Sequence, residues 1–295
     1  MDDSATTPPG KGNTTMSADL KEKILNELID ELEHDKLVLP SLPEVALKVR
    51  DTVEDENAGT KDIAKVIATD AALSARLIQV ANSPLLRGAK HIDSVDMAVT
   101  RMGRTIVKNC VNSLIVQQMF QPTTEVTDKL FREFWEHSTE VAAISQALAG
   151  FARQKPDQAM LAGLVHDIGA LPIIKRAEDV PELLDNEAML REIILEIHTR
   201  IGTALLTKWD FPAEIIAVAR EHEDLKRDKS GAPDLVDVVI AANLQSYFGK
   251  NHPHAKVSWS TVPAFAHLGL DTEVSVIDME DTGESIKEMQ AALRS

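Results

Sequence analysis

Apolar residues recur at three- and four-residue spacing along most of the chain, which is the period of an amphipathic α-helix. Ile24, Leu28 and Leu32 are spaced in this way, and so are Leu73 and Leu77. No segment carries a pattern strong enough to predict a strand. We therefore predict an all-α protein with helices at about residues 19–33, 43–53, 60–67, 71–81, 94–103, 106–115, 128–150, 157–170, 187–208, 212–222, 233–248 and 284–294.

Proline and glycine divide these helices. Pro43 and Pro212 each suit the first position of a helix, and Pro122 interrupts the chain between two helical halves. The first residues are polar, with too few apolar groups to offset the entropy of ordering the chain. We expect a disordered tail at 1–18, an N-terminal helical lobe at 19–122, a second helical lobe at 123–250, and a segment at 251–295 that wraps the surface and ends in a helix.

Composition narrows the class of protein. Of 295 residues, 44% are apolar and 4% aromatic, which excludes global disorder and favours helices over strands. The net charge of −16 disfavours broad binding of nucleic acid. A single cysteine excludes an internal disulfide framework and is typical of a reducing compartment. Without a signal sequence or a run of about 20 apolar residues, we expect a cytoplasmic protein with no membrane partner.

Four of the nine histidines fall on apolar helix faces: His137, His166 (followed by Asp167), His198 and His222. An unpartnered polar group in a core costs about 1–3 kcal/mol, so each ring needs a partner. One interpretation is four hydrogen-bonded core residues. The other is one metal site, because imidazoles and a carboxylate on facing helices bind metal in helical bundles. The spacing leaves both interpretations open.

The other titratable candidates sit in less informative settings. Cys110 has apolar neighbours at helical spacing, which predicts an inert buried thiol. The remaining histidines lie in polar or loop-like stretches, and for these we expect solvated side chains: His34, His91, His252, His254 and His267.

Several motifs resemble the HDOD domain family over about residues 36–250. They keep the order Leu39-Pro-Ser-Leu-Pro-Glu-Val45, Val80-Ala-Asn82-Ser83, Phe134-Trp-Glu-His137, Ala162-Gly-Leu-Val-His166-Asp167-Ile-Gly169, Ile197-His198, Lys208-Trp-Asp-Phe-Pro212 and Glu221-His222-Glu223. The resemblance implies a bacterial signal-transduction or regulatory protein, folded as a multi-helix bundle with an HD-like C-terminal lobe. HDOD domains are relatives of the HD and HD-GYP metal-dependent phosphohydrolases, usually without demonstrated catalysis.

The resemblance also implies a ligand set. His137, His166, Asp167, His198 and His222 occupy metal-ligand positions of the catalytic relatives, where one divalent ion (iron, manganese or zinc) is the implied cofactor. The chain departs from those enzymes at Asn243, where they carry an aspartate, and at Glu221, where the HD-GYP pattern has a histidine. Ala170 stands where they have a lysine, and no Gly-Tyr-Pro signature follows Glu223.

Three functional hypotheses follow from the resemblance and its departures. The first is a regulatory module that binds a signalling protein or a small molecule without catalysis, so that no catalytic residue is assigned. The second is a metal-dependent phosphohydrolase acting on a nucleotide or cyclic dinucleotide. The third is a metal kept for structure or sensing. The loss of the aspartate and the lysine favours the first hypothesis over the second.

Overall fold

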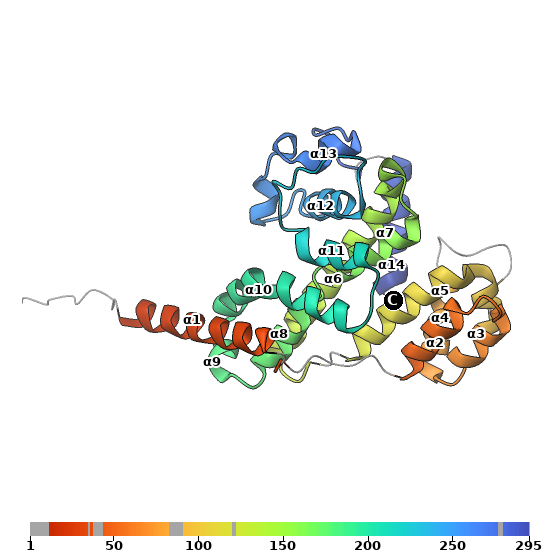
Figure 1. Cartoon of the computed structure of the whole chain (residues 1–295), viewed down its shortest axis with the longest axis horizontal. Helices are drawn as coiled ribbons and strands as arrows, with labels where there is room; N and C mark the ends of the chain where they lie inside the picture. Colours follow the sequence, from red (N-terminus) through yellow and green to blue (C-terminus); the bar gives the residue numbers. More distant parts are fainter. Residues whose placement is uncertain are drawn as a thin grey trace, which may run out of the picture.

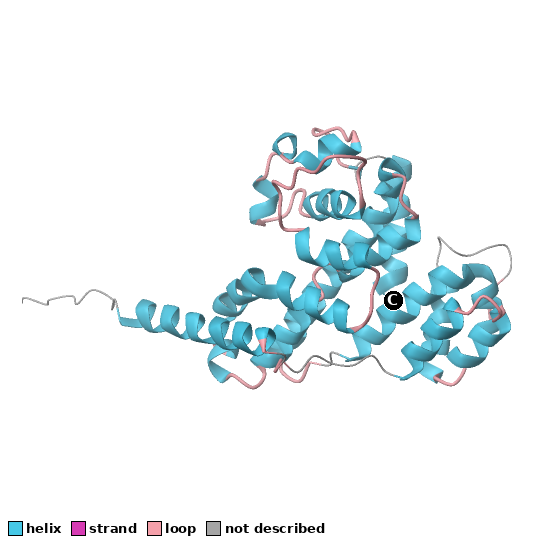
Figure 2. Ribbon diagram, viewed as in Figure 1, coloured by secondary structure: helices cyan, strands magenta, loops and turns pink. Residues whose placement is uncertain are grey.

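The computed structural model describes residues 12–34, 36–37, 44–82, 91–119, 122–276 and 280–294. Within these ranges the chain forms only helices and loops (Figures 1 and 2), which confirms the all-α prediction. The α-helices of the first half are α1 (Gly12–Glu33), α2 (Glu44–Glu54), α3 (Thr60–Ile67), α4 (Ala71–Ala81), α5 (Val95–Met119) and α6 (Glu125–Leu148).

The second half contains α7 (Pro156–Val165), α8 (Ala170–Ala177), α9 (Pro181–Leu184), α10 (Glu187–Lys208), α11 (Ala213–Glu221), α12 (Leu235–Ser246), α13 (Pro263–Leu268) and α14 (Glu280–Arg294). Short 3₁₀-helices are η1 (Ala149–Ala152), η2 (Pro253–Lys256) and η3 (Trp259–Thr261). Among the described residues, no helix is both long and apolar enough to cross a lipid bilayer.

The N-terminal helix differs from its prediction. It begins at Gly12 instead of Asp19, so the expected disordered tail is helical from Gly12 onward, and residues 1–11 lie outside the described part. It packs on α10 of the second half, where Lys21 pairs with Glu192 at 3.0 Å. Ile24 and Leu28 bury the face that their four-residue spacing predicts. Helix α1 therefore packs with the helices of the second half of the chain and lies away from α2–α5 (Figure 1).

Helices α2–α5 pack on one another as a separate group. The predicted helices at 94–103 and 106–115 form the two parts of α5, which is interrupted by non-helical backbone at Gly103, where the first of them is predicted to end. This residue has φ 75° and ψ 166°, a conformation that costs glycine little because it has no Cβ. Asn82, at the end of α4, bonds Ile92 on both sides: its Nδ2 donates to the Ile92 carbonyl (2.7 Å) and its Oδ1 accepts from the Ile92 amide (2.9 Å).

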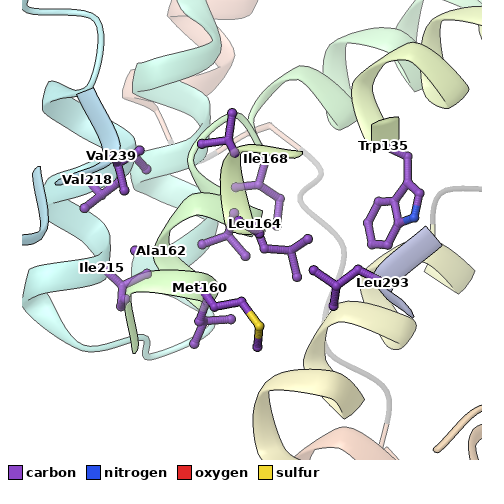
Figure 3. Packing of buried hydrophobic residues seen from close by; sticks show 14 of the residues in the cluster. Trp135, Met160, Ala162, Leu164, Ile168, Ile215, Val218, Val239 and Leu293 are labelled. Carbon is purple, nitrogen blue, oxygen red and sulfur yellow. The ribbon is translucent and has the colours of Figure 1, made fainter. Parts of the chain in front are cut away.

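The main core lies between α6, α7, α8, α10, α11 and α12. Figure 3 shows Met160, Leu164 and Ile168 at its centre, with Val218 on one side and Leu293 of α14 on the other. Helices α6 and α7 cross closely, because a Cβ atom at Gly163 would lie 2.7 Å from Ser145 Oγ. This crossing brings the middle of α6 against the end of α7.

The C-terminal segment does more than wrap the surface. Trp259 and Phe265 stack with ring centroids 5.1 Å apart, and both are buried. The last helix packs on α6 and contacts α4, with Ile286, Met289 and Leu293 buried as their spacing predicts. The segment therefore contributes apolar side chains to the core.

Candidate metal centre

The structure brings the other four candidate ligands together around Asp167. His137 comes from the middle of α6, His198 from α10, and His222 from the residue that ends α11. His166 and Asp167 lie in the turn between α7 and α8, so the predicted continuous helix at 157–170 is wrong. Helix α7 ends at Val165, and the turn directs the Asp167 carboxylate toward the other rings.

Gly169 explains how this turn approaches α10. A Cβ atom at this position would overlap the backbone carbonyl oxygen of His198 and the amide of Gly202. The absence of a side chain lets the backbone of the turn lie directly on α10. As a result Asp167 Oδ1 lies 3.3 Å from His198 Nε2.

The two oxygens of Asp167 face different histidines. Oδ1 is 2.9 Å from His222 Nε2 and 3.3 Å from His198 Nε2. Oδ2 is 3.3 Å from His166 Nε2 and 3.6 Å from His137 Nε2. We call these two groups the Oδ1 position and the Oδ2 position. The carboxylate therefore lies between two sets of nitrogen atoms, as a bridging ligand would.

Hydrogen bonds to the backbone fix the orientation of three rings. In His166, His198 and His222 the Nδ1 atom lies 2.7, 2.9 and 3.0 Å, respectively, from the backbone carbonyl oxygen three or four residues earlier. A carbonyl oxygen only accepts, so each Nδ1 carries the proton and donates it. In the neutral ring Nε2 is then an unprotonated acceptor, which is the orientation that outer partners give to metal-binding histidines.

In this arrangement the Nε2 atoms and the carboxylate oxygens, all hydrogen-bond acceptors, face one another without a donor. The Nε2 atoms of His198 and His222 are 3.3 Å apart, and both face a carboxylate that has no proton to donate. Nε2 of His166 is buried without a hydrogen-bond partner among the described residues. A cation resolves this repulsion. Ligand atoms around one ion with bonds of about 2.1 Å are about 3.0–3.4 Å apart, which fits these spacings.

The pKa shifts of these residues are those expected of a site that binds a cation. Burial lowers the pKa of His166 to about 3 and that of His137 to about 4, against the opposing charge of Asp167. Both rings are therefore neutral at pH 7, as metal ligands must be. Burial raises the pKa of the Asp167 carboxyl, but the charge of His166 and the bonds from His198 and His222 outweigh it and hold this pKa well below its ordinary value.

Protonation of one ring is the other way to supply a cation. Burial lowers the pKa of His198, but the hydrogen bond and charge of Asp167 outweigh burial and raise it to about 9. A single proton on His198 can satisfy Asp167 on the Oδ1 side. It leaves Nε2 of His166, on the Oδ2 side, without a donor. The residues present therefore fit a bound metal better than a proton.

Glu223 joins the site although the sequence analysis assigned it no role. Its Oε1 lies 3.7 Å from His222 Nε2, and it belongs with Asp167, His198 and His222 to one group of possible ligands. His137, His166 and Asp167 form the second such group. Glu223 follows His222 directly in the chain, and this adjacency was the only signal in the sequence.

Glu221, in contrast, faces away from these ligands. Its carboxylate accepts from Arg227 Nε at 2.8 Å and from Arg220 Nη2 at 2.5 Å. Arg227 also pairs with Asp234 and with the fully buried Asp237. The residue at the degenerate ligand position thus anchors the loop between α11 and α12.

Asn243 and Tyr247 lie one turn apart along α12. Asn243 is buried, and its Oδ1 has no hydrogen-bond partner in the described part of the chain. The hydroxyl of Tyr247, at the end of the helix, lies 3.3 Å from His137 Nε2. Burial raises the pKa of Tyr247 above its ordinary range, so the phenol stays protonated. The face of α12 that carries Asn243 is therefore the one that reaches the metal-ligand candidates, through the hydroxyl of Tyr247.

Two histidines expected to be solvated lie beside the site instead. His252 stacks on Tyr247 with ring centroids 3.7 Å apart, and His254 Nε2 is 3.5 Å from Glu223 Oε2. Both follow α12 in a stretch without hydrophobic periodicity, so no sequence pattern indicated their place beside the site. Of the other three, His34 and His91 are exposed as expected, whereas His267 contacts the buried Asp237. Burial raises the pKa of Cys110 to about 12, which confirms an inert thiol.

Comparison with known proteins places this geometry in context. The family model of the HDOD domain matches residues 39–225. The chain is also similar to the crystal structure of a candidate metal-dependent phosphohydrolase from Shewanella amazonensis. The two are 30% identical with a TM-score of 0.81, and the match covers 92% of this chain and 99% of that one.

More distant structures share the fold alone. An HDOD domain protein of unknown function from Geobacter sulfurreducens is 22% identical with a TM-score of 0.62, and the match covers 94% of this chain and 98% of that one. A candidate signal transduction protein from Marinobacter aquaeolei is 20% identical with a TM-score of 0.63, over 99% of this chain and 69% of that one.

One relative in sequence has no assigned function. It is an uncharacterized protein of Treponema pallidum, 27% identical over 224 residues. The match covers 71% of this chain but only 42% of that protein, so the chain spans less than half of its length.

Proposed function

The chain belongs to the HDOD domain family, and from this premise we propose that it is a regulatory protein that holds a divalent metal ion at Asp167 and acts by binding a signalling protein or a small molecule, without catalysis. The observation that carries the metal is the set of Nε2 atoms of His166, His198 and His222 around one carboxylate, with each ring oriented by the hydrogen bond of its Nδ1 to a backbone carbonyl. Imidazole and carboxylate ligands together suit iron, manganese or zinc.

Two departures from the hydrolases support the non-catalytic part of this proposal. The resemblance implies an aspartate where Asn243 stands, and an amide brings no negative charge to offset a dication. It also implies a lysine where Ala170 stands. Ala170 is buried at the start of α8, and its methyl group offers a phosphate no charge.

A second candidate function is metal-dependent phosphoester hydrolysis. It is favoured by the division of the Asp167 oxygens between two ligand groups, because a bridging carboxylate is common where two ions lie about 3.5–4 Å apart. The name of the Shewanella relative points the same way. Metal ions bound there would supply an activated water and stabilise charge on phosphoryl oxygens. The chain would contribute the ligands and the fixed ring orientations.

Elemental analysis tests the metal. The protein is purified without chelator or nickel affinity resin, alongside His222→Ala and the matched control His91→Ala, which removes an exposed histidine of the first group of helices. Because His222 is fully buried, Asp167→Asn serves as a second, nearly isosteric variant. We expect one or more equivalents of iron, manganese or zinc in the wild type and in His91→Ala, and a clear loss in the other two.

Turnover then separates the two functions. The metal-loaded wild type is incubated with nucleotides and cyclic dinucleotides and assayed for release of phosphate or of a linear product. Metal without turnover supports the regulatory function, and turnover that disappears in Asp167→Asn supports the hydrolase. If no metal binds even after loading, both proposals fail and the histidines are hydrogen-bonded core residues.

A further inference from the structure

His137 differs from the three other candidate histidine ligands in how its ring is held. The described residues include no backbone carbonyl bonded to His137 Nδ1, whereas His166, His198 and His222 each have one. The hydrogen bond of the His137 ring instead involves Nε2, the atom that would bind a metal. The Tyr247 hydroxyl lies 3.3 Å from Nε2, closer than the Asp167 oxygen at 3.6 Å.

This contact occupies the lone pair that a metal would need. If Nε2 is unprotonated, it accepts the hydrogen of the Tyr247 hydroxyl. If Nε2 carries the proton, it donates to the hydroxyl oxygen or to Asp167. In either case the ring has no free lone pair at Nε2. The Oδ2 position therefore has only one ready ring, His166, while the Oδ1 position has two prearranged rings and Glu223.

Stacked rings hold Tyr247 in place. Its ring stacks on His137 with centroids 4.9 Å apart and on His252 with centroids 3.7 Å apart. His254 meets its edge at 5.6 Å. Tyr247 lies directly after α12, where the regular helix ends and the loop to η2 begins. A movement of this loop could withdraw the hydroxyl without unwinding the helix.

We propose that Tyr247 is a latch that withholds His137 from a second metal ion, so that the chain binds one ion tightly at the Oδ1 position and a second one only when the hydroxyl releases His137. This inference rests on the proposed metal binding and specifies how it is regulated. Binding of an ion at the Oδ2 position then depends on the conformation of residues 247–254, a segment that a protein or small-molecule partner can reach.

Metal titration tests the latch. Metal-free wild type, Tyr247→Phe and Phe248→Leu are titrated with Mn²⁺ and the bound ions are counted. Phe248 is a suitable control because it is half exposed in the same segment and contacts Trp259 rather than His137. We expect the second ion to bind about 5- to 10-fold more tightly in Tyr247→Phe, which is the value of one neutral hydrogen bond. The first ion should bind equally in all three proteins.

A second readout uses the single tyrosine of the chain. Fluorotyrosine incorporated at this position gives one ¹⁹F resonance, which we expect to shift at the second equivalent of diamagnetic Zn²⁺, and not at the first. An unchanged or weaker second affinity in Tyr247→Phe would overturn the latch while leaving the metal centre intact. Failure of even the first ion to bind the wild type would overturn the metal centre itself, and the latch with it.

Discussion

Gly169 lies so close to His198 that a Cβ atom on the glycine would overlap the histidine's backbone carbonyl oxygen. The contact places the turn that carries Asp167 directly on the helix that carries His198. Two ligand candidates that are far apart in the sequence thus become neighbours through a residue that has no side chain. The geometry of the metal centre depends on this close approach.

We predict that Gly169→Ala destabilises the fold and disturbs the site. The added methyl group meets backbone atoms of α10, which cannot move aside like a flexible side chain, so we expect a loss of at least about 1–3 kcal/mol in the free energy of unfolding. Urea unfolding measures it. Gly150→Ala is the matched control, because no atom lies within 4 Å of its added Cβ. Equal stabilities of the two variants would contradict the contact.

Much of the fold could be predicted from periodicity. Helices α3 and α10 begin and end where the sequence pattern places them, and the apolar faces that carry His198 and His222 are buried. Periodicity failed at residues 166–169, where apolar residues continue the helical pattern although the chain turns. The turn depends on the contact of Gly169 with α10, which local sequence does not report.

The site was predictable only in part for the same reason. Their positions on apolar helix faces indicated four candidate histidines: His137, His166, His198 and His222. These positions did not indicate that the four rings lie together at one site. His254 lies in η2, a 3₁₀-helix too short for a period to indicate which side chains face inward. Its place beside Glu223 follows from the packing of the segment after α12, which a single sequence does not encode in any local pattern.

Asn82 gives a prediction for the first group of helices. Its side chain donates to and accepts from the backbone of Ile92, closing the loop between α4 and α5. We expect Asn82→Asp to lower the free energy of unfolding by about 1–3 kcal/mol, because the donor is lost and a carboxylate then faces the Ile92 carbonyl. Thermal unfolding measures the change. Asn251→Asp, at an exposed bend, should change it by less than about 0.5 kcal/mol.

Arg227 provides a test of the Glu221 cluster. Its guanidinium is mostly buried and pairs with Glu221, Asp234 and Asp237, the last of which is fully buried. We expect Arg227→Gln to cost about 3 kcal/mol in urea unfolding, because Asp237 keeps its charge and loses a cation. Arg220→Gln removes an exposed partner of Glu221 and should cost less than about 1 kcal/mol. A small effect of Arg227→Gln would show that the cluster contributes little to stability.

Glu178 sets a pH dependence at the start of α6. Its Oε1 accepts from the Thr123 amide at 2.5 Å and from the Thr127 hydroxyl at 2.8 Å, and Lys175 binds its other oxygen. Burial raises the pKa of Glu178, but the bond from Lys175 and those from the two threonines outweigh it and lower the pKa to about 2. A pKa lowered by folding means that the carboxylate stabilises the fold above its ordinary value of 4.5.

We therefore predict that this stabilisation is lost as the pH falls from about 4.5 through about 2. At pH 7, Glu178→Gln should lower the free energy of unfolding by about 1.5–3 kcal/mol, the value of hydrogen bonds to a charged group. The difference between wild type and variant should shrink in urea titrations at pH 4, 3 and 2.5. Glu182→Gln, at an exposed position nearby, should leave stability unchanged at every pH. A difference that stays constant down to pH 2.5 would mean that the charge of Glu178 contributes nothing.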